Sequence, residues 1–460
     1  MSNRETDRKR IKAFLKFLVD RMSKEAWEIR RAALVKRITQ QESSIDLSLP
    51  IEPQLFTPPQ DDIDWYLLVA DLAYDHPFSD SAYSSTRIYP YAMTIGAYSD
   101  LLQKIPNVED VLKKMLANNS KPETQIFELL TATHYLKNGY KVEFIPENSI
   151  TWPDGITKRS PDLLVKSGDI EMYVECKRAD KQTKYSQSEV DSWNTIWSEL
   201  SAHMLKVAPW SIIDVTFHGQ VTDASIDDLI SSVDTLVKQG GGKVSVGSTT
   251  TELLRINKTQ LHKHYQENAV RPNSPQHEIL VFGRADSNEK RSIATIAKSI
   301  VRPGTSEDFL NIYVESVGNC VAAQWRCDHE LSVERRSRHF KGLISNAIKQ
   351  FPPHKLGIVH VWYETVEGIN IEELRQEKHI SEISEFNADG TLVLGVLIHG
   401  VNYYPNEGNY DWAETVQDFA RIPDLMRLYR QALMLSADKI NEIEDTTHWA
   451  QDKATKLNTP

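Results

Sequence analysis

Residues 160–177 of this 460-residue chain read SPDLLVKSGDIEMYVECK, in which two apolar runs flank the dipeptide Gly168-Asp169. A glycine at the first central position suits a two-residue turn of type II′, so these runs predict a β-hairpin. The turn fixes the register, because strands joined by so short a loop pair by simple counting. The predicted pairs are Ser167–Ile170, Val165–Met172, Leu163–Val174 and Asp162–Glu175.

The two faces of this hairpin differ in chemistry. Asp162 and Glu175 share one face with Lys177, and directly opposed side chains in a sheet have Cβ atoms roughly 5 Å apart. Two carboxylates at that separation repel unless a cation or a proton lies between them, so the hairpin predicts a divalent-metal site beside a lysine. Oxygen ligands favour Mg²⁺, for which Mn²⁺ may be exchanged. The other face is apolar and consists of Leu163, Val165, Ile170, Met172, Val174 and Cys176.

This segment resembles the PD-(D/E)XK, or restriction-endonuclease-like, nuclease superfamily. Pro161-Asp162 corresponds to its PD element, and Glu175-Cys176-Lys177 corresponds to (D/E)XK. The resemblance implies that Asp162, Glu175 and the backbone carbonyl of Cys176 bind the metal. It also implies that Lys177 orients or activates the attacking water, while ion and lysine neutralise the charge that develops on the phosphate.

The family also carries an acidic residue on the helix before the hairpin, and Glu128 is the candidate for both catalysis and metal binding. It lies in a predicted helix where it shares a face with Ala132, Tyr135 and Leu136, and a carboxylate in an apolar stripe needs a partner. Glu123 is the rival candidate, but it fits better in a capping box that starts at Ser120.

The helix and strand that close the family's α-β-β-β-α-β core have two candidate positions. The better match is an amphipathic helix around residues 340–351, followed by the apolar run 356–363. The nearer alternative is the helix around 189–205 with the strand 211–218, and the sequence does not choose between them. In the first case Arg335, Arg336 and Arg338 lie at the start of the helix and could face nucleic acid. Gln350 would then correspond to a glutamine that some family members carry on this helix, and it is a further candidate for contact with nucleic acid.

The composition indicates a multidomain globular protein, because 460 residues exceed one ordinary core. The net charge of −11 argues against a surface that is basic throughout, although a local basic groove is compatible with it. Three cysteines cannot build a disulfide framework, and no apolar run suggests a membrane span, so a cytoplasmic location without a membrane partner is expected.

The pattern along the chain predicts an α/β protein with additions around the nuclease core. A helix is expected over about residues 6–38, and the apolar residues Trp412, Val416 and Phe419 also suggest helix near the end. The predicted parts are a helical N-terminal domain at 1–118, nuclease core at 119–185, an insertion at 186–330, nuclease core at 331–403 and a helical C-terminal region at 404–460.

The sequence therefore favours a Mg²⁺-dependent DNA endonuclease, by analogy one from bacterial restriction or antiphage defence. No ATPase motif is apparent, so unwinding or translocation would need a separate ATPase or helicase partner. A homodimer would allow both strands of a duplex to be cut. The alternatives are a nucleic-acid-binding or assembly subunit with an inactive nuclease-like core, and a nuclease that cleaves RNA.

Overall fold

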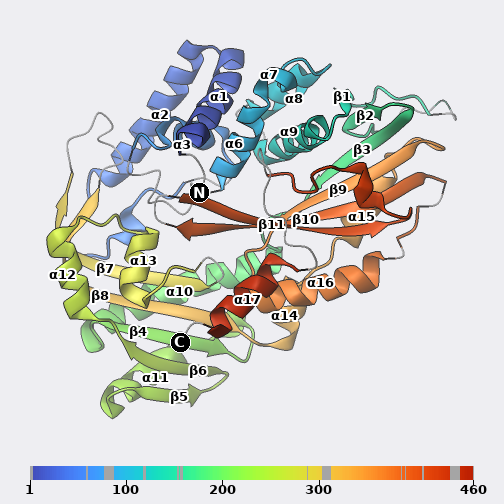
Figure 1. The fold of residues 1–460 in the computed structure, drawn as a ribbon. Coiled ribbons are helices and arrows are strands. Elements are labelled where there is room, and N and C mark those ends of the chain that lie inside the picture. The colour runs from blue at the N-terminus through green and yellow to red at the C-terminus, as the bar shows by residue number, and fades with distance from the viewer. Residues whose placement is uncertain are drawn as a thin grey trace.

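The structure, a computed structural model, describes residues 4–58, 61–76, 87–117, 121–152, 155, 159–286, 289–302, 312–384, 386–388, 390–406, 409–435 and 446–458. The described chain is mixed α/β, with two mixed sheets and many helices (Figure 1). Among these residues no helix is both long and apolar enough to cross a membrane.

The N-terminal part is helical, as the sequence predicts. Its helices are α1 (Arg4–Met22), α2 (Lys24–Glu42), η1 (Glu52–Gln54), α3 (Ile63–Leu72), α6 (Ile88–Ala97), α7 (Ser99–Leu102) and α8 (Val108–Met115). The single helix expected over 6–38 is wrong, because Ser23 divides it. Ser23 takes φ 75°, outside the helical region, and its hydroxyl accepts a hydrogen bond from Ala26 N at 3.2 Å to cap α2.

The first sheet has six strands in the order β1-β2-β3-β9-β10-β11. The strands are β1 (Lys141–Phe144), β2 (Leu163–Ser167), β3 (Ile170–Arg178), β9 (Leu356–Glu364), β10 (Leu392–Asn406) and β11 (Asn409–Ala420). β3, β9 and β10 run parallel, and the other neighbours in this sheet are antiparallel.

The predicted hairpin is confirmed. β2 and β3 pair through Ser167–Ile170, Val165–Met172 and Leu163–Val174, and Gly168 at the turn has φ 58°. The regular ladder ends at Leu163–Val174, one pair before the expected Asp162–Glu175 pair. The expected apolar face is buried except at Ile170 next to the turn, which is 41% exposed.

Two helices lie on opposite faces of this sheet. α9 (Pro122–Lys137) packs on the face of β3 that carries Val174, and α15 (Lys341–Ile348) packs on the other face, beside Val359 and Val361 of β9. β9 pairs directly with β3, so the downstream helix and strand are the ones that complete this sheet. The nearer alternative, 189–205 with 211–218, is wrong because its strand belongs to the second sheet.

The second sheet has the strand order β5-β6-β4-β8-β7. Its strands are β4 (Ser211–Phe217), β5 (Gly242–Val246), β6 (Thr249–Arg255), β7 (Lys290–Val301) and β8 (Tyr313–Cys327). α10 (Lys184–Val207) and α11 (Ile226–Gln239) cover one face, and α12 (Lys258–Glu267) and α13 (Pro275–Phe282) lie on the other. All five strands fall inside the predicted insertion 186–330, whose status as a domain stays a prediction.

The remaining helices connect these parts. They are η2 (Val221–Asp223), α14 (Glu330–Arg336), α16 (Ile369–Ile383), η4 (Leu425–Leu428) and α17 (His448–Asn458). The expectation of a helical C-terminal region is wrong for 404–420, where β10 and β11 form a long hairpin. Trp412, Val416 and Phe419 fit a helical stripe, but β11 pairs with β10 along its whole length, which sets the strand.

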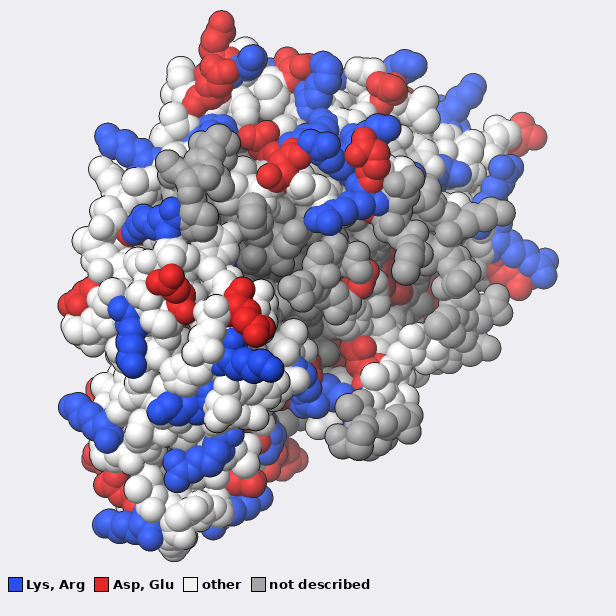
Figure 2. Space-filling view, turned by 60° about the vertical axis from the view of Figure 1, so that its left-hand side comes forward, with Lys and Arg blue, Asp and Glu red and all other residues white. Residues whose placement is uncertain are grey.

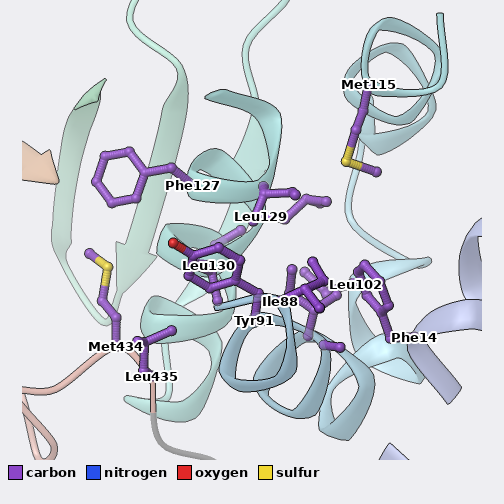
Figure 3. Close-up of a cluster of buried hydrophobic side chains, with 14 of the residues drawn as sticks. Phe14, Ile88, Tyr91, Leu102, Met115, Phe127, Leu129, Leu130, Met434 and Leu435 are labelled. Carbon is purple, nitrogen blue, oxygen red and sulfur yellow. The ribbon is translucent and has the colours of Figure 1, made fainter. Parts of the chain in front are cut away.

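The N-terminal helices and the first sheet share one hydrophobic core. Figure 3 shows how side chains from several helices meet in it: Phe14 of α1, Ile88 and Tyr91 of α6, and Phe127 and Leu130 of α9. Met434 and Leu435 enter the same cluster from the segment after η4. This shared core holds α9 firmly against β3, which positions the candidate site.

Candidate active site at the Asp162–Glu175 hairpin

Asp162 lies where the ladder between β2 and β3 ends. Its backbone N–H donates to Val174 O at 3.1 Å, and its side-chain Oδ2 accepts from the backbone N–H of Cys176 at 2.7 Å. The carboxylate thus replaces the backbone carbonyl that would otherwise accept the hydrogen bond from Cys176 of β3. This contact fixes the Asp162 carboxylate beside residues 175–177 of the neighbouring strand.

Glu175 is fully buried, and its two carboxylate oxygens have different surroundings. Oε1 accepts a hydrogen bond from Gln350 Nε2 at 2.7 Å and also pairs with the ammonium group of Lys177. Oε2 is buried and has no hydrogen-bond partner among the described residues. A buried carboxylate oxygen without a partner is unfavourable unless a cation or a donor reaches it.

Gln350 is the candidate residue that the structure brings in from farthest along the chain. It follows the end of α15, is buried, and donates to Glu175 from a position 175 residues away in sequence. From the sequence, Gln350 is a candidate for contact with nucleic acid. In the structure its side-chain amide instead orients a carboxylate of the site.

Glu128 lies on α9, and the electrostatics couple it to the hairpin. Burial raises the pKa of Glu128 well above its ordinary value, and the nearby charges of Asp162 and Glu175 raise it further. Burial also raises the pKa of Glu175, to about 8, with the charge of Asp162 as the next cause. The pKa of Asp162 is raised by burial too, against the opposing effects of the Cys176 amide and Lys177. Three carboxyl groups therefore stand close enough to hinder one another's ionisation.

Cys176 contributes backbone rather than side-chain chemistry. Its thiol is buried on the core face, as expected, and burial raises the thiol pKa well above its ordinary value. A thiol in such surroundings is inert as a nucleophile. Its N–H is already used by Asp162, and the role of its carbonyl as a metal ligand stays a prediction.

The three arginines predicted to contact nucleic acid have different surroundings. Arg336 is buried at the end of α14, where it donates to Glu367 Oε2 at 3.2 Å and to Glu367 O at 3.0 Å, with Glu189 nearby. The prediction for Arg336 is therefore wrong in this structure, because its guanidinium is engaged inside the protein. Arg335 and Arg338 are exposed, but they lie at and after the C-terminal end of α14 rather than at the start of α15.

Two cations near the carboxylates were missed from the sequence. Lys114, from the last turn of α8, and Arg159 both lower the pKa of Glu128 and of Asp162. Arg159 stands three residues before Asp162, so its proximity could have been noted. Lys114 comes from the N-terminal helices, and no local pattern connects it to the hairpin.

Glu123, the rival to Glu128, belongs to a separate buried network. Its carboxylate pairs with Arg87 and with Arg178, and its backbone N–H donates to Asp61 Oδ1 at 2.8 Å. The capping box is not seen, since the residue before α9 is Lys121 and it makes no side-chain cap. Ser120 lies outside the described residues.

The donor set suits a hard divalent cation. Among the described residues no three His, Cys, Asp or Glu side chains are gathered in a ready-made metal site. The carboxylates of Asp162 and Glu175 fit an ion such as Mg²⁺, which keeps several waters and accepts few protein ligands. Glu175 Oε2 is free of hydrogen bonds among the described residues and could bind it, and the Cys176 carbonyl is the predicted third ligand. Glu128 as a direct ligand stays a prediction.

Comparison of the chain with models of protein families, with curated proteins and with solved structures finds no significant match. The assignment of the site therefore rests on its own geometry and chemistry.

We predict that binding of Mn²⁺ or Mg²⁺ releases protons and strengthens as the pH rises. The pKa of Glu175 is about 8, so at pH 7 this carboxyl is mostly protonated without a cation, and the ion must displace that proton. Affinity should increase up to about pH 8 and then level off, since the group is ionised above its pKa. Calorimetric titration in buffers of different ionisation enthalpy measures the released protons, and binding that is independent of pH would contradict this prediction.

Proposed function

We propose that this protein is a Mg²⁺-dependent DNA endonuclease with a PD-(D/E)XK site formed by Asp162, Glu175 and Lys177. The observation that carries this proposal is a pair of carboxyl groups with raised pKa values, Glu175 buried and Asp162 half-buried, set beside a lysine on one hairpin. A core with such groups is unfavourable by itself and becomes favourable around a divalent cation.

The order of elements supports the same proposal. A helix, three antiparallel strands, a second helix and a parallel strand follow as α9-β1-β2-β3-α15-β9, with the two helices on opposite faces of the sheet. This order supports the proposal because the restriction-endonuclease-like core has an α-β-β-β-α-β arrangement. The second sheet then forms part of an insertion between β3 and α15.

Each residue of the site has a role that follows from its contacts. Asp162 and Glu175 would hold the ion, and the Cys176 N–H fixes the Asp162 carboxylate through its hydrogen bond to Oδ2. When bound, the ion supplies Lewis-acid activation of water and neutralises charge on the phosphate. Lys177, only 14% exposed, orients the attacking water and stabilises the negative charge that grows on the phosphate oxygens. Gln350 fixes the rotamer of Glu175 through its hydrogen bond to Oε1.

The biological setting is proposed by analogy alone. Restriction or antiphage defence suits a nuclease core with large additional parts, and a homodimer or a separate ATPase partner would extend its action on DNA. These proposals do not follow from the geometry of the site and are tested separately from it.

The direct test of the site is cleavage of circular and linear DNA with Mg²⁺, Mn²⁺ or EDTA. We expect metal-dependent cleavage that falls by about 100-fold or more in both Asp162→Ala and Lys177→Ala, the size typical for removing one group that stabilises the transition state. The matched controls are Glu171→Gln and Lys166→Ala. These residues form an exposed ion pair at 2.8 Å on the same hairpin, and their variants should cleave like the wild type.

Cleavage that survives both substitutions would contradict the proposal. Binding of DNA without any metal-dependent cleavage would favour the scaffold function, and cleavage of RNA alone would move the substrate class from DNA to RNA.

We further predict that Gln350→Ala lowers cleavage by about 10- to 100-fold, because a hydrogen bond to a charged group contributes about 1.5–3 kcal/mol. The loss should appear in kcat and in the metal concentration needed for half-maximal rate, since Gln350 touches Glu175 and not the substrate. Ser345→Ala, on the exposed side of α15, is the control. Unchanged metal dependence in Gln350→Ala would exclude this positioning role.

A further inference from the structure

A tryptophan with an unusual backbone conformation lies at one end of the second sheet. Trp210 connects α10 to β4 and has φ 60°, a region that favours glycine. Both of its backbone groups are fixed, since Trp210 N donates to Cys320 O at 2.9 Å and Trp210 O accepts from Ile256 N at 3.0 Å. The neighbouring strands β8 and β6 thus hold a large aromatic residue where a glycine would fit with less strain.

The indole of Trp210 is partly exposed and has cationic neighbours. Lys258 Nζ lies 4.9 Å from the ring centroid, and the ring of His262, one turn further along α12, lies 5.1 Å away at 50°. Lys298 of β7 is close to the same group, because burial first, and then Lys258 and Lys298, lower the pKa of His262. Two elements, α12 and β7, therefore bring polar or cationic side chains to the surroundings of Trp210 and His262.

The basic residues around Trp210 are not neutralised by acidic partners. Lys258 and Lys298 are both exposed, and neither forms an ion pair with a carboxylate among the described residues. Figure 2 shows Lys and Arg side chains, interspersed with Asp and Glu, over the lower-left part of the molecule.

The basic residues of the N-terminal helices provide the contrast. Lys12 lies 3.0 Å from Asp75, and Arg30 and Arg31 pair with Asp64 and Asp71 of α3 at 2.6 and 3.2 Å. In a chain of net charge −11, the cations near Trp210 are thus an unpaired group beside a partly exposed aromatic ring. Unpaired cations with an aromatic platform are the combination that binds single-stranded nucleic acid, whose phosphates and unstacked bases they match.

We propose that Trp210, with Lys258 and Lys298, forms a binding surface for single-stranded DNA on the α12 side of the second sheet. An unpaired base stacks on the indole, and the ammonium of Lys258 moves from the ring to a phosphate. The choice of DNA rests on the proposed nuclease function, and this surface would hold an unpaired stretch of the substrate outside the Asp162–Glu175 site.

The test is the fluorescence anisotropy of a labelled single strand of about 20 nucleotides, long enough to cover one such surface. The full-length protein is titrated in EDTA, which prevents metal-dependent cleavage, over about 50–200 mM salt. Trp210→Gly removes the ring and suits φ 60°, so the fold is retained, while Trp210→Phe keeps an aromatic face. Lys258→Ala with Lys298→Ala removes two cations, and Lys24→Ala with Lys36→Ala on α2 removes the same charge elsewhere.

We expect Trp210→Gly to weaken binding by about tenfold or more and Trp210→Phe to weaken it by less than about threefold. The Lys258/Lys298 double variant should lower the slope of log affinity against log salt by about 1–2, while the α2 control leaves it unchanged. The proposal is overturned if the wild type does not bind the strand, or if Trp210→Gly and the double variant bind as the wild type does. Cleavage by these variants is measured separately, so a failed surface with intact cleavage remains distinct from a failed nuclease site.

Discussion

Asp162 and Glu175 place two carboxyl groups beside each other in a buried part of the first sheet, where their negative charges repel. Such repulsion is stronger here than in water, because the effective dielectric constant of a protein interior is lower. The protein offsets part of it with three donors: the Cys176 amide on Asp162, and Gln350 and Lys177 on Glu175. Protonation offsets more, as the raised pKa values indicate. A divalent cation would satisfy both groups at once, which is why we interpret the pair as a metal site.

This arrangement depends on parts of the chain that lie far apart in sequence. The hairpin supplies both carboxylates and the lysine. Glu175 is oriented by Gln350, which follows all strands of the second sheet in the sequence. Parallel pairing of β9 with β3 brings α15 back across the face that carries Glu175. On the other face, α9 is held by a core shared with the N-terminal helices, and it brings Glu128 toward the same carboxylates. Folding of the second sheet and of the N-terminal helices therefore supports the site without contributing its central residues.

The hairpin could be predicted from the sequence because its information is local. Gly168 fixes the turn, the alternation of apolar residues fixes the faces, and the register follows from both. The return of β9 to β3 could be suggested but not chosen, because a parallel strand has no turn that identifies its neighbour. The strand β11 was predicted as helix because Trp412, Val416 and Phe419 have helical spacing, whereas in the structure Trp412 and Val416 contact one core and Phe419 contacts the other. Glu414 of β11 is buried and accepts a hydrogen bond from His399 of β10 at 2.8 Å. The helical spacing of the apolar residues does not predict this contact between the two strands.

Arg336 shows the same limit for function. An arginine next to two others in the sequence looks like a nucleic-acid contact, yet its partners Glu367 and Glu189 lie 31 and 147 residues away and hold it inside the protein. Gln350 and Lys114 illustrate the converse, since their relation to the carboxylates appears only when the chain is folded.

The central claim is that Asp162 and Glu175 hold a divalent cation, and diffraction from crystals soaked in Mn²⁺ tests it most directly. The account predicts an anomalous peak between the two carboxylates, in contact with Glu175 Oε2 and with the Cys176 carbonyl turned toward it. An absence of any peak there, with the Lys177–Glu175 ion pair unchanged at saturating Mn²⁺, would contradict it.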